Sequence, residues 1–279
     1  MNILYHYCST TAFHSIIKNK EIWLSSLKLS NDTMEGKLVT ETMQRFAKKD
    51  NLNNYSIDCL QNLMALLEKN FDGLGLCFST DGDLLSQWRG YSDDGAGVAI
   101  GFSKKYLESI RDKLQKGKKQ VFLDDVKYST KEHEDQIRSI YDKIKTHIEF
   151  NPLNNSLKIP TTHRNKEEID TKNNVFQLLL ESSKLLPKLF FLKKKAFSEE
   201  MEWRLVYLYN HDNDYCQYRT NQSQIIPYIF LGIPNTDISP IEEIILGPKH
   251  PTPVNVIIDL LQKSNFTDVK VLKSKASYR

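Results

Sequence analysis

The 279 residues suit one large domain or two small ones, and the content of 40% hydrophobic and 26% charged residues is that of an ordinary globular chain. The formal net charge of +3, from 38 basic and 35 acidic residues, is too balanced to predict binding to nucleic acid or to an anionic membrane. No apolar run approaches the ~20 residues that span a bilayer, and the N-terminus MNILYHYCST lacks the basic and apolar regions of a secretion signal.

The first half of the chain alternates short strands with helices. Residues 3–7 predict a strand, and Ser9 can cap a helix that places Phe13, Ile16 and Ile17 on one face. The further elements that we expect up to residue 128 are a strand over 22–27, helices over 33–49 and 57–70, a strand over 73–79, a short helix over 83–90, a strand over 96–102, a helix over 103–116 and a strand over 120–128.

The second half begins with helices and ends with strands. An apolar period predicts a helix over 134–150, and the polar run 151–174 predicts a surface connection. We expect a helix over 175–194 that is broken or kinked at Pro187, then strands over 201–209, 215–220, 225–233 and 241–248, a helix over 252–264 and a strand over 269–273. This order predicts a single α+β domain, 1–279, whose sheet is built from both ends of the chain and which carries a mostly helical insertion at 103–195.

Cysteine and histidine spacing bears on metal and disulfide chemistry. The four cysteines are scattered, with no CxxC pair, and the histidines show no metal-ligand spacing. We therefore expect no metal site, no disulfide framework and a reducing, cytoplasmic location.

The segment FSEEMEWRLVY at 197–207 carries two glutamates and an arginine within a predicted strand. Alternation places Glu200, Glu202 and Arg204 on one face and Met201 and Trp203 on the other. Such a row either faces water as a Glu–Arg pair on a half-exposed sheet, or lines a polar cleft where a carboxylate stabilises developing positive charge. Nearby, the run Lys193–Lys195 predicts a solvated face, with a phosphate contact as the alternative.

Two further segments carry residues of interest. In LYHYCS, His6 and Tyr7 lie on opposite faces of the first strand, and we expect His6 to approach Ser25 on a neighbouring strand. In DLLSQWRGY at 83–91, helical spacing predicts core packing for Trp88, whereas Arg89 and Tyr91 lie at the helix end and are expected to face a ligand. The following DDGAGVA does not form a GxGxxG fingerprint, which excludes a Rossmann site.

Four blocks, LYHYCSTTAFHSIIKNKEIWLSS, LLSQWRGYSDDGAGVAIGF, FSEEMEWRLV and SKASYR, together resemble a large bacterial family known as a domain of unknown function. The order of elements also resembles the ADP-ribosyltransferase fold. That resemblance implies a split central mixed β-sheet with a nicotinamide pocket between its halves. The sequence departs from the fold's pattern in its long helical insertion and in reading Cys-Phe-Ser-Thr where the fold has Ser-Thr-Ser.

The resemblance also implies residue roles. Glu202 is similar to the catalytic glutamate of that fold, and Glu200 precedes it as in Glu-x-Glu members. His6 would hold the adenosine ribose of NAD, Tyr91 or Trp88 would stack on nicotinamide, and Arg89 would pair with the pyrophosphate. The full set of implied NAD-binding residues is His6, Tyr7, Ser25, Ser79, Thr80, Trp88, Arg89 and Tyr91.

The function that follows is cleavage of the nicotinamide–ribose bond of NAD, with ADP-ribose passing to a protein, a nucleic acid or water. By analogy such an enzyme acts as a toxin or in phage defence. Two alternatives stay open. One is a non-catalytic module that binds a nucleotide or a partner, and the other is a metal-dependent nucleic-acid enzyme that uses Asp93, Asp94, Glu200 and Glu202.

Overall fold

The computed structural model of the chain has an α+β fold around one large, mostly antiparallel sheet, and it describes residues 2–29, 36–150, 166–210, 216–221, 223–234 and 237–277. The strand order is β10-β9-β4-β1-β3-β2-β8-β7, with β6 beside β3 and β5 beside β6. The strands are β1 Ile3–Cys8, β2 Glu21–Ser26, β3 Phe71–Ser79, β4 Val98–Ser103, β5 Val121–Asp125, β6 Glu202–Asn210, β7 Gln217–Asn221, β8 Gln224–Gly232, β9 Ile241–Leu246 and β10 Lys270–Lys273.

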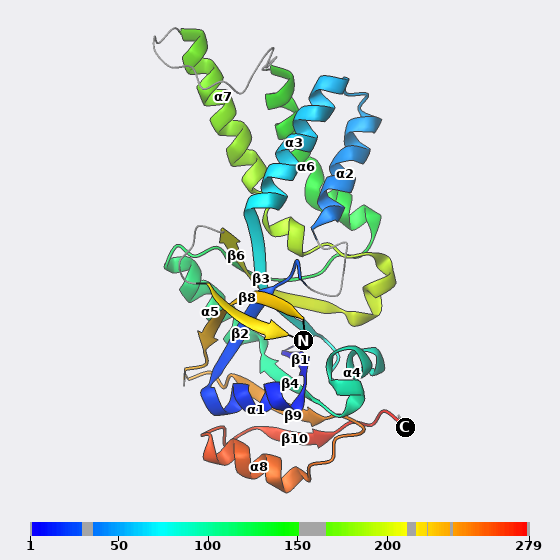
Figure 1. The fold of residues 1–279 in the computed structure, drawn as a ribbon, viewed down its shortest axis with the longest axis vertical. Coiled ribbons are helices and arrows are strands. Elements are labelled where there is room, and N and C mark those ends of the chain that lie inside the picture. Colours follow the sequence, from blue (N-terminus) through cyan, green and yellow to red (C-terminus); the bar gives the residue numbers. More distant parts are fainter. Residues whose placement is uncertain are drawn as a thin grey trace.

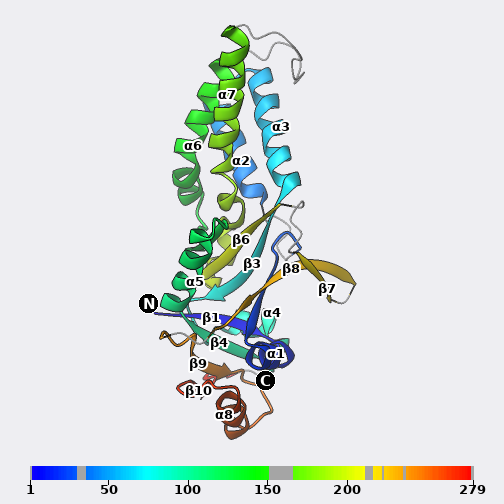
Figure 2. The same cartoon turned by 90° about the vertical axis from the view of Figure 1, so that its left-hand side faces the viewer.

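Helices cover the sheet on two sides, and the buried residues form two large hydrophobic clusters and a small third one around Trp88. The helices α2, α3, α6 and α7 rise together from one end of the molecule, whereas α8 lies at the other end beside β9 and β10 (Figure 1; Figure 2). The helical segments are α1 Thr10–Asn19, α2 Lys37–Lys49, α3 Asn54–Asn70, α4 Leu85–Tyr91, α5 Lys104–Lys116, α6 Thr130–Phe150, α7 Lys166–Ser183 and α8 Val254–Lys263, with short 3-10 turns η1 Asp93–Gly95, η2 Pro187–Phe190 and η3 Lys195–Glu200.

The helical layer comes from two distant stretches of sequence rather than from the range 103–195 alone. Met43 of α2 and Leu60 of α3 share one buried cluster with Tyr141 of α6 and Phe190 of η2. Within the expected insertion, α5 and β5 instead pack into the opposite core beneath the sheet, where Leu107 is fully buried. The helices α2 and α3 precede β3 and α6 follows β5, so the layer joins segments from both sides of the central strands.

Of two expectations about the middle of the chain, one is wrong and the other is confirmed. Residues 166–174, expected within a surface connection, belong to α7, and the first part of that connection, 151–165, lies outside the described residues. The helix expected over 175–194 is broken before Pro187, which is one of the two outcomes expected for that proline. It ends at Ser183, and Pro187 opens η2. Proline has no N–H to donate and restricts the residue before it, which favours ending the helix.

The central sheet divides at β3. One edge of β3 pairs with β6 along its whole length, from Phe71 to Ser79. The other edge pairs with β2 at Leu74 and Gly75, and with β1 only at Ser79. The strands β1 and β2 thus share one edge of β3 and diverge around Leu76–Phe78, where the sheet opens.

The close approach between β1 and the turn before β4 makes a prediction about stability. A Cβ atom on Gly97 would lie 2.2 Å from the carbonyl oxygen of Cys8, whereas one on Gly90, in α4, would meet nothing within 4 Å. We expect Gly97→Ala to lower the free energy of unfolding by about 1–3 kcal/mol, as overpacking does. Gly90→Ala should leave it unchanged or raise it by up to ~1 kcal/mol, because alanine favours helix. Urea unfolding of both variants tests this, and equal effects would contradict it.

Candidate functional site

A cleft occupies the opening between β1 and β2, and it has two arms. The arms share four lining residues, His6, Leu27, Cys77 and Tyr91. We call the whole the split cleft. Its charged arm is also lined by Lys193, Glu200, Glu202 and Arg204, and its aromatic arm by Trp23, Ser25, Arg219 and Ile226 among others.

Strand register places the charged residues of the cleft on one face of the sheet. Cys77 pairs with Arg204, and Ser79 pairs with Glu202, across the antiparallel ladder of β3 and β6. Directly paired residues point to the same side of a sheet. This is the side on which Val206, two residues beyond Arg204, packs into the helical core. The row predicted from alternation is therefore turned towards the helices and buried, which excludes a half-exposed sheet face.

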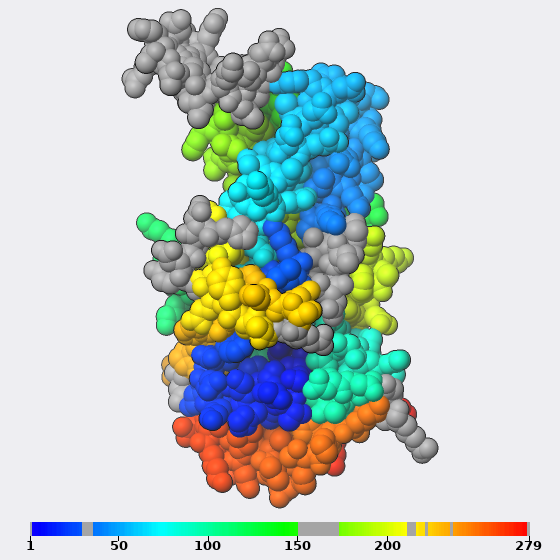
Figure 3. All heavy atoms as spheres, viewed as in Figure 1, coloured from blue at the N-terminus to red at the C-terminus, as the bar shows by residue number. Residues whose placement is uncertain are grey.

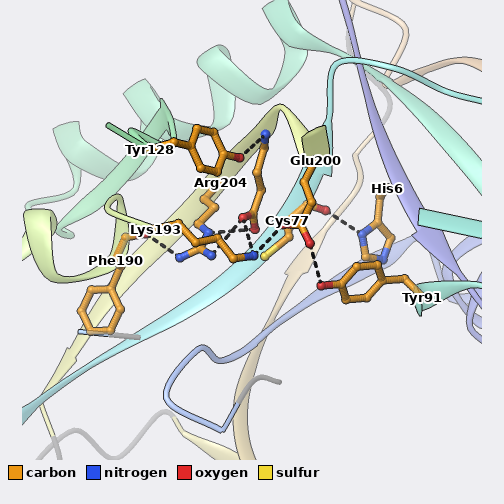
Figure 4. A network of polar contacts seen from close by, with 9 residues as sticks. His6, Cys77, Tyr91, Tyr128, Phe190, Lys193, Glu200 and Arg204 are labelled. Atoms are coloured by element: carbon orange, nitrogen blue, oxygen red, sulfur yellow. Dashed lines mark hydrogen bonds and ion pairs between the residues drawn. The ribbon is translucent and has the colours of Figure 1, made fainter. Parts of the chain in front are cut away.

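The glutamate and arginine of β6 form a buried bidentate pair. Arg204 Nε lies 2.8 Å from Glu202 Oε1, and Nη2 lies 3.0 Å from Oε2. The remaining guanidinium nitrogen donates to the carbonyl oxygen of Phe190 at 2.7 Å (Figure 4). Only 2% of Arg204 is exposed. The parallel fork of an arginine matches both oxygens of a carboxylate, so this pair is held in one geometry.

Lys193 adds a second cation, and the prediction of a solvated lysine run is wrong for it. Its Nζ lies 2.6 Å from Glu200 Oε2 and 3.2 Å from Glu202 Oε2, and the residue is buried. The exposed residues of the run are Lys194 and Lys195. A signal was present in the sequence, because Lys193 directly follows the apolar run Leu189–Leu192, all of which is buried.

Glu200 lies outside the strand but still reaches the charged arm. It ends η3, and Met201 next to it has a φ of 43°, which turns the chain before β6 begins. The Tyr91 hydroxyl, 3.4 Å away, donates to Glu200 Oε1, so α4 and η3 meet across the cleft. The sequence pattern correctly placed Glu200 on the same side as Glu202, but it assumed that Glu200 belongs to the strand. In the structure, the 3-10 turn η3 and the left-handed residue Met201 direct Glu200 to that side.

Burial and charge set the protonation states in this arm. Burial raises the pKa of Glu202, but the adjacent charges of Arg204 and Lys193 outweigh it and lower the pKa to about 2. Burial also opposes the charged form of Lys193, yet Glu202 and the hydrogen bond to Glu200 raise its pKa above the ordinary value. The arm therefore holds charged groups at neutral pH.

Cys77 is a lining residue that the sequence analysis missed. Its thiol hydrogen-bonds Glu202, and burial together with the Glu202 charge raises its pKa well above the ordinary value. A protonated thiol is a weak nucleophile. Cys77 therefore serves here as a donor to Glu202, and its position in the middle of a strand-like run gave no sequence signal.

His6 fills the opening in the sheet. Its Nδ1–H donates to the carbonyl oxygen of Cys77 at 2.9 Å, because a carbonyl can only accept (Figure 4). Burial lowers the pKa of the ring, so the neutral form with an unprotonated Nε2 is favoured. His6 and Ser25 both line the aromatic arm. They do not lie on paired strands as expected, since β3 runs between β1 and β2.

Tyr7 and Trp88 fix α4 against the sheet. Trp88 is fully buried, its ring packs edge-on against Tyr7 at 4.8 Å between centroids, and its Nε1 donates to Asp83 Oδ1. The Tyr7 hydroxyl donates to the carbonyl of Asp81 and accepts from the N–H of Leu84. Trp88 is thus used in packing and lines neither arm, whereas Tyr7 packs against it and also lines the charged arm, and Tyr91 is the aromatic residue of α4 that reaches the cleft.

Three other implied NAD-binding residues do not line the split cleft. Ser79 is buried, and its hydroxyl accepts from the N–H of Asp81. The N–H of Thr80 donates to the carbonyl of Met201, which ties the end of β3 to the turn before β6. Arg89 is exposed on α4. Neither arm of the cleft includes any of them.

The acidic residues expected for a metal-dependent enzyme lie in two places. Asp94 forms an ion pair with Lys249 at 2.8 Å, apart from the glutamates, which bind Lys193 and Arg204. In the part of the chain that the structure describes, no group of three or more histidine, cysteine, aspartate or glutamate residues is placed to hold a metal ion. Within the same residues, no helix combines the length and apolarity needed to cross a membrane.

Comparison with known proteins gives a family match for the middle of the chain. A family model described as "Protein of unknown function (DUF2971)" matches residues 87–205. The match includes Tyr91, Lys193 and the β6 pair, but His6 and Cys77 lie before it. No curated protein and no solved structure matches the chain.

Proposed function

We propose that the chain cleaves the nicotinamide–ribose bond of NAD and passes ADP-ribose to an acceptor, which is a protein, a nucleic acid or water. The observation that carries this proposal is the position of two carboxylates, Glu200 and Glu202, at one end of a cleft in a split sheet. The shared centre of that cleft is lined by His6 and Tyr91. The order of elements that suggested the ADP-ribosyltransferase fold supports the same proposal.

The chemistry needs negative charge beside the ribose. When the bond from ribose C1′ to the pyridinium nitrogen breaks, its electron pair leaves with neutral nicotinamide, and C1′ becomes part of an oxocarbenium-like centre. The acceptor then forms a bond to C1′ and loses its proton to a base. A fixed carboxylate stabilises the cationic centre as it develops.

The two carboxylates have different parts in this proposal. Both oxygens of Glu202 are held by Arg204, and one also by Lys193, so Glu202 acts as a fixed ionised group with a pKa of about 2. Glu200 is held by Lys193 through Oε2, while its Oε1 has, among the described residues, the long contact from the Tyr91 hydroxyl. A ribose hydroxyl can displace that contact, so Glu200 is the group that we place against the sugar.

One observation favours a second candidate, a non-catalytic nucleotide-binding module. The charged arm contains two cations as well as two carboxylates, and Arg204 neutralises Glu202 in a bidentate pair. This compensation weakens the field that a carboxylate exerts on a developing cation. A module of this kind binds NAD without releasing nicotinamide.

Nicotinamide release by the purified chain at millimolar NAD decides between the two candidates. We expect Glu200→Gln to lower the rate by about 100-fold or more, the usual effect of removing one group that stabilises the transition state. Glu199→Gln is the matched control, because Glu199 is the exposed neighbour on η3 and should keep the full rate. Binding of NAD with no release identifies the binding module, and a Glu200→Gln enzyme of unchanged rate contradicts the assigned role.

A further inference from the structure

The aromatic arm contains an arginine to which the sequence gives no role. Arg219 lies on β7, at the edge of the sheet, and pairs with Ile226 of β8. Its Nε and Nη2 donate to the Ser25 hydroxyl at 3.3 and 3.2 Å, which directs the guanidinium across β8 and into the cleft. Figure 3 shows the hairpin of β7 and β8, in yellow, against the blue N-terminal segment that carries β2.

The charge of Arg219 is not balanced as that of Arg204 is. None of the ion pairs formed among the described residues includes Arg219, and its hydrogen-bond partner there is a neutral hydroxyl. Burial lowers the pKa of the guanidinium, which shows the cost of removing it from water. A half-buried cation in a cleft is stabilised by an anion, and the fork of an arginine suits a phosphate.

A fixed aromatic ring stands on the same face of the sheet. Trp23 is 38% exposed and lines the same arm as Arg219. Its ring lies 4.5 Å from that of Tyr228, and its Nε1 donates to Glu21 Oε1 at 3.0 Å. An indole held in this way loses little further freedom on binding, so it provides a rigid surface on which a base can stack.

We propose that Arg219 and Trp23 form the subsite for a nucleoside diphosphate, with Arg219 on a phosphate and Trp23 on the base. This inference rests on the proposed function only in the choice of a nucleotide. The cleft continues from this subsite past Cys77 and Tyr91 to Glu200, so a dinucleotide bound here extends towards the carboxylates. Arg219 takes the pyrophosphate role that the sequence resemblance gave to Arg89.

Calorimetric titration of the full chain with ADP and with adenosine tests the subsite without any catalytic step. We expect Arg219→Gln to raise the Kd for ADP by about 10- to 100-fold, since a charged hydrogen bond is lost. The Kd for adenosine should change by less than about 2-fold, because adenosine has no phosphate for Arg219 to bind. Arg219→Lys should lie between, since it keeps the charge but not the fork. Trp23→Ala should weaken ADP and adenosine alike.

The controls separate a phosphate contact from a general loss of structure. Arg111→Gln removes an arginine that lines a different hollow, and it should leave both affinities unchanged. Equal weakening of ADP and adenosine by Arg219→Gln overturns the proposal. So does wild-type protein that binds ADP no more tightly than adenosine, or binds neither at millimolar concentration.

The same variants distinguish failure of the subsite from failure of the proposed function. Weaker ADP binding in Arg219→Gln, with no nicotinamide release by the wild type, supports the subsite and contradicts NAD cleavage. Nicotinamide release with a KM for NAD that is unaffected by Arg219→Gln supports NAD cleavage and overturns the subsite.

Discussion

Replacing Arg204 by methionine should lower the free energy of unfolding by about 3–5 kcal/mol, the cost of breaking a buried ion pair by removing one partner. Arg204 is almost completely buried and binds both oxygens of Glu202 as well as the carbonyl of Phe190. Methionine fills similar volume but leaves Glu202 with Lys193 as its remaining cation. Urea unfolding at neutral pH measures the change.

Two comparison variants make this result specific. Arg111→Met removes an arginine from a surface pair with Asp112 and should cost about 0–1 kcal/mol. The double variant with Arg204→Met and Glu202→Gln should lose less than the sum of the two single losses, because neither buried charge is then left without its partner. Strictly additive losses would show that the pair is not coupled and would contradict the geometry of β6.

Acid should remove a stabilising contribution that belongs to Glu202. The pKa of this group is lowered from an ordinary value of 4.5 to about 2, so its contribution is complete above pH 4.5 and is lost as pH falls through about 2. At roughly 1.4 kcal/mol per pKa unit the full contribution is about 3 kcal/mol, of which about 2 kcal/mol is lost by pH 3.

Unfolding at pH 6 and pH 3 isolates this contribution. Glu202→Gln has no carboxyl at this position, so it should lose about 2 kcal/mol less than the wild type over the same interval. Glu199→Gln, altered at the exposed neighbouring glutamate, should lose as much as the wild type. An equal acid loss in wild type and Glu202→Gln would mean that Glu202 is not ionised within an ion-pair cluster.

Most of the local structure could be predicted from the amino-acid sequence. Helical periodicity predicted the bounds of α1, α2, α3 and α6 to within a few residues, because apolar residues on one face of a helix recur every three or four positions. Alternation correctly placed Glu202 and Arg204 on one face of β6, and helical spacing predicted the buried position of Trp88. These features depend on residues only a few positions apart in the chain, so they can be read from a single sequence.

How those residues act together depends on contacts between segments that are distant in the sequence. The burial of Glu202 depends on helices from two distant stretches that cover one face of β6. Lys193 enters the cluster because the chain after η2 folds back over the sheet. Arg219 contacts Ser25, which lies 194 residues before it in the sequence, across the intervening strand β8. The cleft itself exists because β1 and β2 share one edge of β3 and diverge. Strand register and the packing of the helical layer depend on contacts between residues far apart in the sequence, so no local sequence pattern determines them.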